Sequence, residues 1–345
     1  MGAGLVVLAA AAAVAAPEVL RDKATTYATR SHRVTVTAAT QAEWRARRGP
    51  PQAGCAAFRV GDAHLEIGNT DEVFVEHCGA FPPRPPNGTA TVAVCVPVVY
   101  GDFLKTDRGL RWTARFLDHY RALAVSRFVV YTATDVPGLF LGDDVALVHV
   151  AWLAECAAPS VRKRHGARCD FAANRSIMYW GQNFVLNDCL QRAAAEGFDW
   201  TLNVDLDELL TFAPPVRDVV AFLEERPSAD VVSLGSAVEA PVPCAAQSRE
   251  APCVSRPPAQ PTCAKCADCA LCLRNHGRRK HLSRTRRVAK ANVHFVQASA
   301  CLGETPCAID DTSTHTAWLR HFSRPSRRTL LFEGRADWCP RCAAR

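Results

Sequence analysis

The chain has 345 residues, which is enough for one large hydrophobic core with a small accessory domain. Its hydrophobic fraction of 48% and charged fraction of 22% are those of a globular protein and not of a disordered one. The net charge of +7 is modest, so its distribution along the chain is more informative than its size.

The N-terminus looks like a targeting segment. Residues 5–16 are LVVLAAAAAVAA, an apolar run of signal-peptide length that is too short to span a bilayer comfortably. The chain also has 16 cysteines, which would largely pair in an oxidising compartment. We therefore expect residues 1–29 to be a signal-like or anchor segment, with the protein in the secretory pathway, in the Golgi membrane or lumen. A flexible alanine-rich start is the alternative.

Residues 30–88 are expected to form a small β-rich stem region followed by a Pro-rich linker. Short β-like runs occur at 33–37, 57–60, 64–67 and 73–75, before the linker sequence GAFPPRPPNG. Cys55 and Cys78 are the only cysteines of this region and are candidates for a disulfide. The sequon at Asn87 would be glycosylated in a secreted protein.

The pattern changes at residue 89, where apolar strand-like runs begin to alternate with helical ones. The expected strands are 91–100, 127–134, 145–152, 200–207 and 230–237, and the expected helices are 107–124, 174–196 and 216–225. This alternation predicts an α/β domain with a mostly parallel sheet, whose ligands bind beyond the carboxyl ends of the strands. We assign 89–335 to this domain, with a Cys- and Pro-rich insertion at 241–273 and a tail at 336–345.

The stretch DWTLNVDLDELL places two acids at the end of the fourth strand. If the strand continues, Asn203, Asp205 and Asp207 share one face, with the two carboxylates about 6–7 Å apart. Like charges at that distance favour a cation between them, and oxygen ligands suit Mg²⁺ or Mn²⁺ bridging to substrate phosphates. Alternatively, Asp207 caps a helix that begins at Glu208, and Asp205 merely ends the strand.

Six blocks of the sequence resemble, in the same order, those of family 92 glycosyltransferases and their relatives with the GT-A fold. The acid segment resembles the family's W…D-x-D-E element, and the other blocks are VAVCVPVVYGDF, LRWTARFLDHYRALAVSRFVVYTATD, the Q…NDCL helix, GRRKHLSRTRRVAKANVHFV and LRHFSRPS. The likeness covers roughly residues 90–335. It departs from the family pattern at Thr285, where the family has proline, and in the closing HF, where the family has HY.

The resemblance implies an α/β, GT-A enzyme that uses a nucleotide-sugar donor and Mn²⁺ or Mg²⁺. The donor would be a UDP-sugar, with galactose a candidate sugar, and the acceptor would be a hydroxyl of a glycan or glycoconjugate. By carry-over, the implied metal ligands are Asp205, Asp207 and His321, and the implied nucleotide-binding residues are Pro97, Tyr100, Asp135, Asp205, Lys280 and Arg284. A histidine ligand favours Mn²⁺. A hydrogen-bonded structural histidine is the alternative for His321.

Family 92 enzymes invert the anomeric centre, which requires one general base for the acceptor hydroxyl. Glu239, Asp310 and Asp311 are the candidates, and the sequence does not choose among them. Each is also an ordinary surface or capping acid in the alternative interpretation.

Two further features leave a second hypothesis open. Residues 274–290 carry many Arg and Lys residues with no acid, which predicts a solvated loop, the rim of an anion site or a nucleic-acid surface. The ladder PTCAKCADCALCL spaces cysteines 263, 266, 269 and 272 evenly; we favour a disulfide-stapled loop, with zinc or a cluster, or free thiols, as alternatives. The remaining cysteines at 301, 307, 339 and 342 are candidates for local pairs. The competing hypotheses are a zinc module that binds nucleic acid and a catalytically silent relative of the transferases, whereas the leading one needs no nucleic acid.

Overall fold

The fold is that of a computed structural model, which describes the chain in segments. The described residues are 18–22, 24–28, 32–39, 43–44, 46, 55–60, 70–79, 89–153, 169–171, 175–177, 181–240, 272–294, 296–312 and 317–321. The insertion at 241–271, the linker at 80–88 and the C-terminal part from residue 322 lie outside this set.

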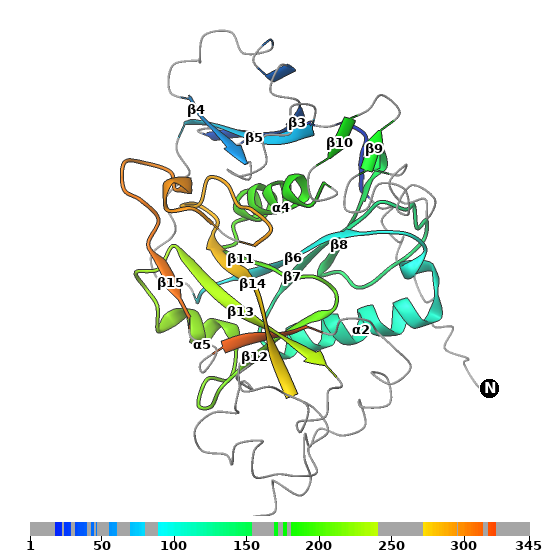
Figure 1. The fold of residues 1–345 in the computed structure, drawn as a ribbon, viewed down its shortest axis with the longest axis vertical. Helices are drawn as coiled ribbons and strands as arrows, with labels where there is room; N and C mark the ends of the chain where they lie inside the picture. Colours follow the sequence, from blue (N-terminus) through cyan, green and yellow to red (C-terminus); the bar gives the residue numbers. More distant parts are fainter. Residues whose placement is uncertain are drawn as a thin grey trace, which may run out of the picture.

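A mixed ten-stranded sheet forms the centre of the molecule (Figure 1). Its strand order is β1-β8-β7-β6-β11-β14-β13-β16-β12, and β15 pairs with β13 off this path. The strands are β1 (Glu18–Leu20), β6 (Val92–Val99), β7 (Arg127–Thr132), β8 (Val145–Val150), β11 (Trp200–Asn203), β12 (Glu208–Phe212), β13 (Val231–Ala240), β14 (Cys272–Arg284), β15 (Ile309–Asp311) and β16 (Ala317–His321).

The half of the sheet from β1 to β11 is parallel throughout. Along the chain, β7 and β8 are added on one side of β6, and β11 is then placed on the other side. The order therefore reverses between β6 and β11, and such a switch point is where ligands bind in open α/β sheets. Beyond β11, the antiparallel pairings of β14 and β12 make the sheet mixed.

Two helices cover opposite faces of β6. Val94 and Val96 pack in one hydrophobic cluster with Phe116 of α2 (Asp107–Ala122), whereas Cys95 packs in a second cluster with Phe184 of α4 (Gln182–Glu196). Burial on both faces explains why the strand is a continuous apolar run. The smaller helix α5 (Val219–Glu224) joins the cluster on the α2 side through Phe222.

A second, six-stranded sheet lies on the far side of α4, so that α4 is sandwiched between the two sheets (Figure 1). It contains β2 (Ala24–Ala28), β3 (His32–Ala39), β4 (Cys55–Val60), β5 (Thr70–Gly79), β9 (Cys169–Phe171) and β10 (Arg175–Ile177). Val34, Val36 and Val75 share one core with Phe184 of the helix. The N-terminal β region is thus packed into the body of the fold as a layer.

Most of the expected elements are confirmed, and the differences have physical causes. Strands at 33–37, 57–60, 73–75, 91–100, 127–134, 145–152 and 230–237 are present, whereas 64–67 lies outside the described residues. The predicted helix 174–196 is wrong at its start, since residues 175–177 form β10 and the helix begins at Gln182, after Gly181 in a left-handed conformation. The basic run 274–290, predicted as loop, contributes most of β14, a central strand between β11 and β13.

The described part of the chain contains both local and long-range disulfides. Among the described residues they join Cys55 to Cys78, Cys95 to Cys189 and Cys301 to Cys307. The first and third confirm expected pairings, and the second ties β6 to α4. Disulfides are typical of an oxidising, secretory-type environment. Cysteines 263, 266, 269, 339 and 342 lie outside the described residues. Within the described part of the chain, no helix is both long and apolar enough to cross a bilayer.

Candidate functional site

The acids at the end of β11 lie in a tight turn, which we call the acid turn (Asp205 to Glu208). The backbone N–H of Glu208 donates to the carbonyl oxygen of Asp205 at 3.0 Å, and the Glu208 carboxylate accepts from the backbone N–H of Asp205 at 2.9 Å. The prediction of an extended strand through Asp207 is therefore wrong, because β11 ends at Asn203. The alternative in which a helix begins at Glu208 is also wrong, since β12 begins there.

A buried lysine lies against the acid turn. The Nζ of Lys280, on β14, is 3.0 Å from Oδ2 of Asp205 and 3.5 Å from Oε2 of Glu208. The side chains of Lys280 and Glu208 are only 1% and 4% exposed, whereas that of Asp205 is 34% exposed. The lysine therefore acts as an internal counter-ion, and the Asp205 carboxylate lies between it and the solvent.

Burial sets the protonation of this cluster. It raises the pKa of Glu208 to about 7, against the opposing effect of Lys280, and nearby Asp205 adds to the increase. Burial alone would lower the pKa of Lys280, but the Asp205 and Glu208 carboxylates more than offset this and raise it. Lys280 therefore stays charged, and Glu208 is ionised only around neutral pH and above.

Helix α2 contacts the backbone of the acid turn and the start of β12. The indole N–H of Trp112 donates to the Leu206 carbonyl oxygen at 2.7 Å, and the Tyr120 hydroxyl donates to the Glu208 carbonyl oxygen at 2.9 Å. Nε2 of His119 lies 2.8 Å from the Leu210 carbonyl oxygen. The sequence interpretation gave none of these side chains a role, although their spacing of seven and eight residues marks one helical face.

The carboxyl ends of β6 and β7 bring other predicted residues to the same edge. The N–H of Val204 bonds the carbonyl of Cys95 at 3.2 Å, so the register leads Asp205 towards Pro97 and Tyr100. Asp135 follows β7 at this end, with its carboxylate 63% exposed and 4.0 Å from Nδ1 of His149. Of the predicted nucleotide-binding residues, Pro97 thus lies near the carboxyl end of β6, and Tyr100 and Asp135 follow β6 and β7.

Strand register also places His321 and Glu239 near the turn. On β16, His321 is the register partner of Glu208 on β12 and of Val238 on β13. Antiparallel partners have Cα atoms about 4.5–5.5 Å apart. The backbone of His321 is therefore adjacent to the acid turn, and Glu239 is next to it on the neighbouring strand.

Three other predicted residues are not brought to the acid turn. Arg284 pairs with Trp200 at the opposite end of β11, about 13 Å along β14 from Lys280, and its guanidinium bonds the carbonyls of Ala229 and Pro227. Asp310 pairs with Arg226 at 3.0 Å. Asp311 pairs at 3.3 Å with Arg279, whose side chain leaves the strand on the face opposite to that of its neighbour Lys280.

The basic run serves the interior of the fold. Lys280, His281 and Ser283 are buried in the sheet, and Arg287 binds the carboxylate of Asp230 at 3.2 Å. His281 is held neutral, because burial lowers its pKa to about 4. Within the described part of the run, these side chains therefore contact other elements of the fold.

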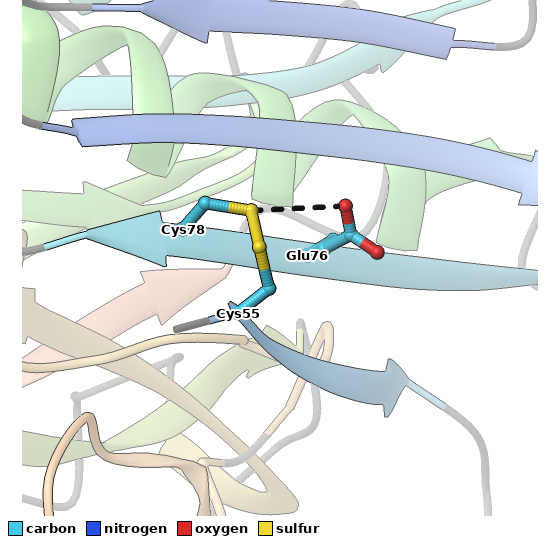
Figure 2. A group of neighbouring side chains, drawn as sticks. All are labelled: Cys55, Glu76 and Cys78. Carbon is cyan, nitrogen blue, oxygen red and sulfur yellow. Dashed lines mark hydrogen bonds between the residues drawn. A yellow bond between two sulfur atoms is a disulfide. The ribbon is translucent and has the colours of Figure 1, made fainter. Parts of the chain in front are cut away.

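The acid turn has the composition of a divalent-cation site. It supplies three carboxylates, two of them partly exposed, against one buried lysine, so excess negative charge and hard oxygen donors remain. Among the described residues, the group whose candidate ligand atoms all lie within 4.8 Å of one another is Cys55, Glu76 and Cys78. Both of its sulfur atoms are in a disulfide (Figure 2), which leaves no thiolate for a metal.

Comparison with known proteins adds no relative to these observations. No protein-family model matches the chain, and no curated protein matches it significantly. The resemblance to family 92 therefore rests on the sequence blocks themselves, and the functional argument rests on the acid turn.

Proposed function

We propose that the chain is a metal-dependent, inverting glycosyltransferase with the GT-A fold. It transfers a sugar from a nucleotide diphosphate, with a UDP-sugar as donor, to a hydroxyl of a glycan or glycoconjugate in the Golgi. The observation that carries this proposal is the position of the acid turn, directly after β11 and beside β6, where the strand order reverses. Counted from β6 along the chain, the order β8-β7-β6-β11 is 3-2-1-4, as in nucleotide-binding α/β folds.

Asp205 and Asp207 would hold the cation, with His321 as the third ligand and Mn²⁺ as the preferred ion. A bound divalent cation neutralises the negative charge that develops on the leaving diphosphate. Lys280 balances part of the charge of Asp205, and Glu208 fixes the backbone between the two ligands through the Asp205 N–H. Pro97, Tyr100 and Asp135 would then contact the nucleoside at the ends of β6 and β7.

We assign the general base to Glu239. Asp310 and Asp311 are each in an ion pair with an arginine. Glu239 is the candidate whose backbone lies beside the register position of His321. A carboxylate there would accept the proton of the acceptor hydroxyl while the sugar–phosphate bond breaks on the opposite face.

The test is calorimetric titration of UDP, then GDP, with and without Mn²⁺. We expect Mn²⁺-dependent binding of one nucleotide that is weakened at least tenfold in Asp207→Asn, because the variant loses one of the anionic ligands. Asp207 is a better choice than Asp205, whose replacement would also remove the closer of the two ion-pair partners of the buried Lys280.

Asp118→Asn is the matched control, since this acid is 73% exposed on α2 and its carboxylate pairs with Arg121. It should bind like the wild type. Failure of oxidised, folded protein to bind any nucleotide would instead favour the catalytically silent relative or the zinc module.

A further inference from the structure

We propose that α2 is a positioning element for the metal site, in which Trp112, His119 and Tyr120 fix the backbone that carries the two acid ligands. The inference rests on the proposed function, because it assumes that Asp205 and Asp207 bind a cation. It assigns a role to side chains that do not touch the substrate, the ion or the reacting atoms.

Hydrogen bonds within the acid turn join its two ends. Its ends are joined by the bond from Glu208 N–H to Asp205 carbonyl and by the Glu208 carboxylate. The peptide unit between these ends, which joins Leu206 to Asp207, is held by the indole of Trp112. Since a peptide unit is planar, fixing the Leu206 carbonyl fixes the plane from which the Asp207 side chain departs.

The other two contacts hold the residues that follow. Tyr120 donates to the Glu208 carbonyl and accepts from the Leu210 N–H at 3.1 Å, so one hydroxyl bridges two peptide units of β12. Burial raises the pKa of Tyr120 well above its usual value, so the hydroxyl keeps its proton as a donor. His119 bonds the Leu210 carbonyl from the half-exposed side of the helix.

This arrangement is more than general packing, because three successive contacts from one helical face reach the same short segment. Metal ligands that are held rigidly lose little freedom when the ion binds, and outer partners of ligands commonly tune metal affinity. Removing the neutral indole donor of Trp112 changes no charge at the site. Any loss of affinity would therefore come from positioning and not from electrostatics.

The experiment measures Mn²⁺ binding alone, from the EPR signal of free Mn²⁺, in wild type, Trp112→Phe and His119→Phe. Trp112→Phe removes the indole donor and keeps an aromatic ring, and we expect the Kd for Mn²⁺ to rise about three- to tenfold. His119 is at a half-exposed position, where a substitution is better tolerated. We expect His119→Phe to raise the Kd for Mn²⁺ about two- to threefold. It decides the question if the buried Trp112 variant does not fold.

Tyr131→Phe is the matched control. Like the α2 variants, it removes one side-chain hydrogen bond. The lost bond is the one that the Tyr131 hydroxyl donates to Asp188, on the α4 side of the sheet. It should lower the melting temperature without changing the Kd. Wild-type affinity in both α2 variants would overturn the inference and leave the proposed function intact, whereas absence of Mn²⁺ binding in the wild type would overturn both.

Discussion

Two clusters of acids on opposite sides of β6 are built differently. Asp188 on α4 is fully buried and accepts hydrogen bonds from the hydroxyls of Thr25, Tyr27 and Tyr131. The guanidinium of Arg192 lies 3.6 Å from it. In the acid turn, by contrast, one lysine faces three acids, and the carboxylate of Asp205 remains one-third exposed.

The difference separates an acid that stabilises the fold from acids that are suited to chemistry. The network of Asp188 is saturated with donors and joins the N-terminal strand β2 to α4, and Arg192 extends it to Glu18 at 2.6 Å. A saturated carboxylate has no capacity for a ligand. The acid turn, in contrast, retains negative charge and a solvent-exposed carboxylate. Asp188 and the acid turn nevertheless both lie in sequence blocks that resemble those of family 92.

The largest expected effect is on the saturated cluster. Asp188→Ala should lower the free energy of unfolding by about 3–5 kcal/mol, because it leaves Arg192 and three hydroxyls without their shared acceptor. Urea denaturation monitored by tryptophan fluorescence measures this. The folded fraction should still bind Mn²⁺ normally.

Asp118→Ala provides the comparison for that variant, since its carboxylate is 73% exposed. Its effect should stay within about 0.5 kcal/mol, as for other surface positions. Equal destabilisation by the two changes would contradict the distinction between the saturated cluster and ordinary surface acids.

A smaller effect is expected from the pH dependence of the acid turn in metal-free buffer. The folded protein holds the proton of Glu208 more tightly than the unfolded chain, because the pKa rises from 4.5 to about 7. Its contribution to stability is therefore fully present below pH 4.5 and is lost as the pH rises through 7. We expect a loss of about 1–3 kcal/mol over this interval, relative to Glu208→Gln.

The comparison with Glu208→Gln is needed because another buried group titrates in the same range. The lowered pKa of His281, about 4, makes its contribution disappear as the pH falls, which is the opposite direction. The difference between the two unfolding curves isolates Glu208. Parallel curves for wild type and variant from pH 4.5 to 7.5 would show that Glu208 does not titrate as described.

The sequence was sufficient where burial produces a continuous apolar run. The strands β6, β7 and β8 were predictable because both of their faces are covered. β14 was not, since its arginines and lysine resemble those of a solvated loop. β14 can lie in the centre of the sheet because its described charged side chains bond acceptors on other elements, as Lys280 does with Asp205. These acceptors are distant in sequence, so the sequence pattern does not reveal them.

The site was predictable in location and less so in form. The end of an apolar strand identified Asp205 and Asp207, but strand alternation could not foresee that the chain turns after Asn203. The bond of the Glu208 carboxylate to the Asp205 N–H stabilises this turn. The contribution of Trp112 depends on how α2 packs, which periodicity does not specify.

The most direct test of the central claim is anomalous diffraction from a crystal of the oxidised protein soaked with Mn²⁺ and UDP. The proposed function predicts a manganese peak in direct contact with the carboxylates of Asp205 and Asp207 and with the diphosphate. A nucleotide bound without manganese at these acids, or manganese bound only elsewhere, would contradict it.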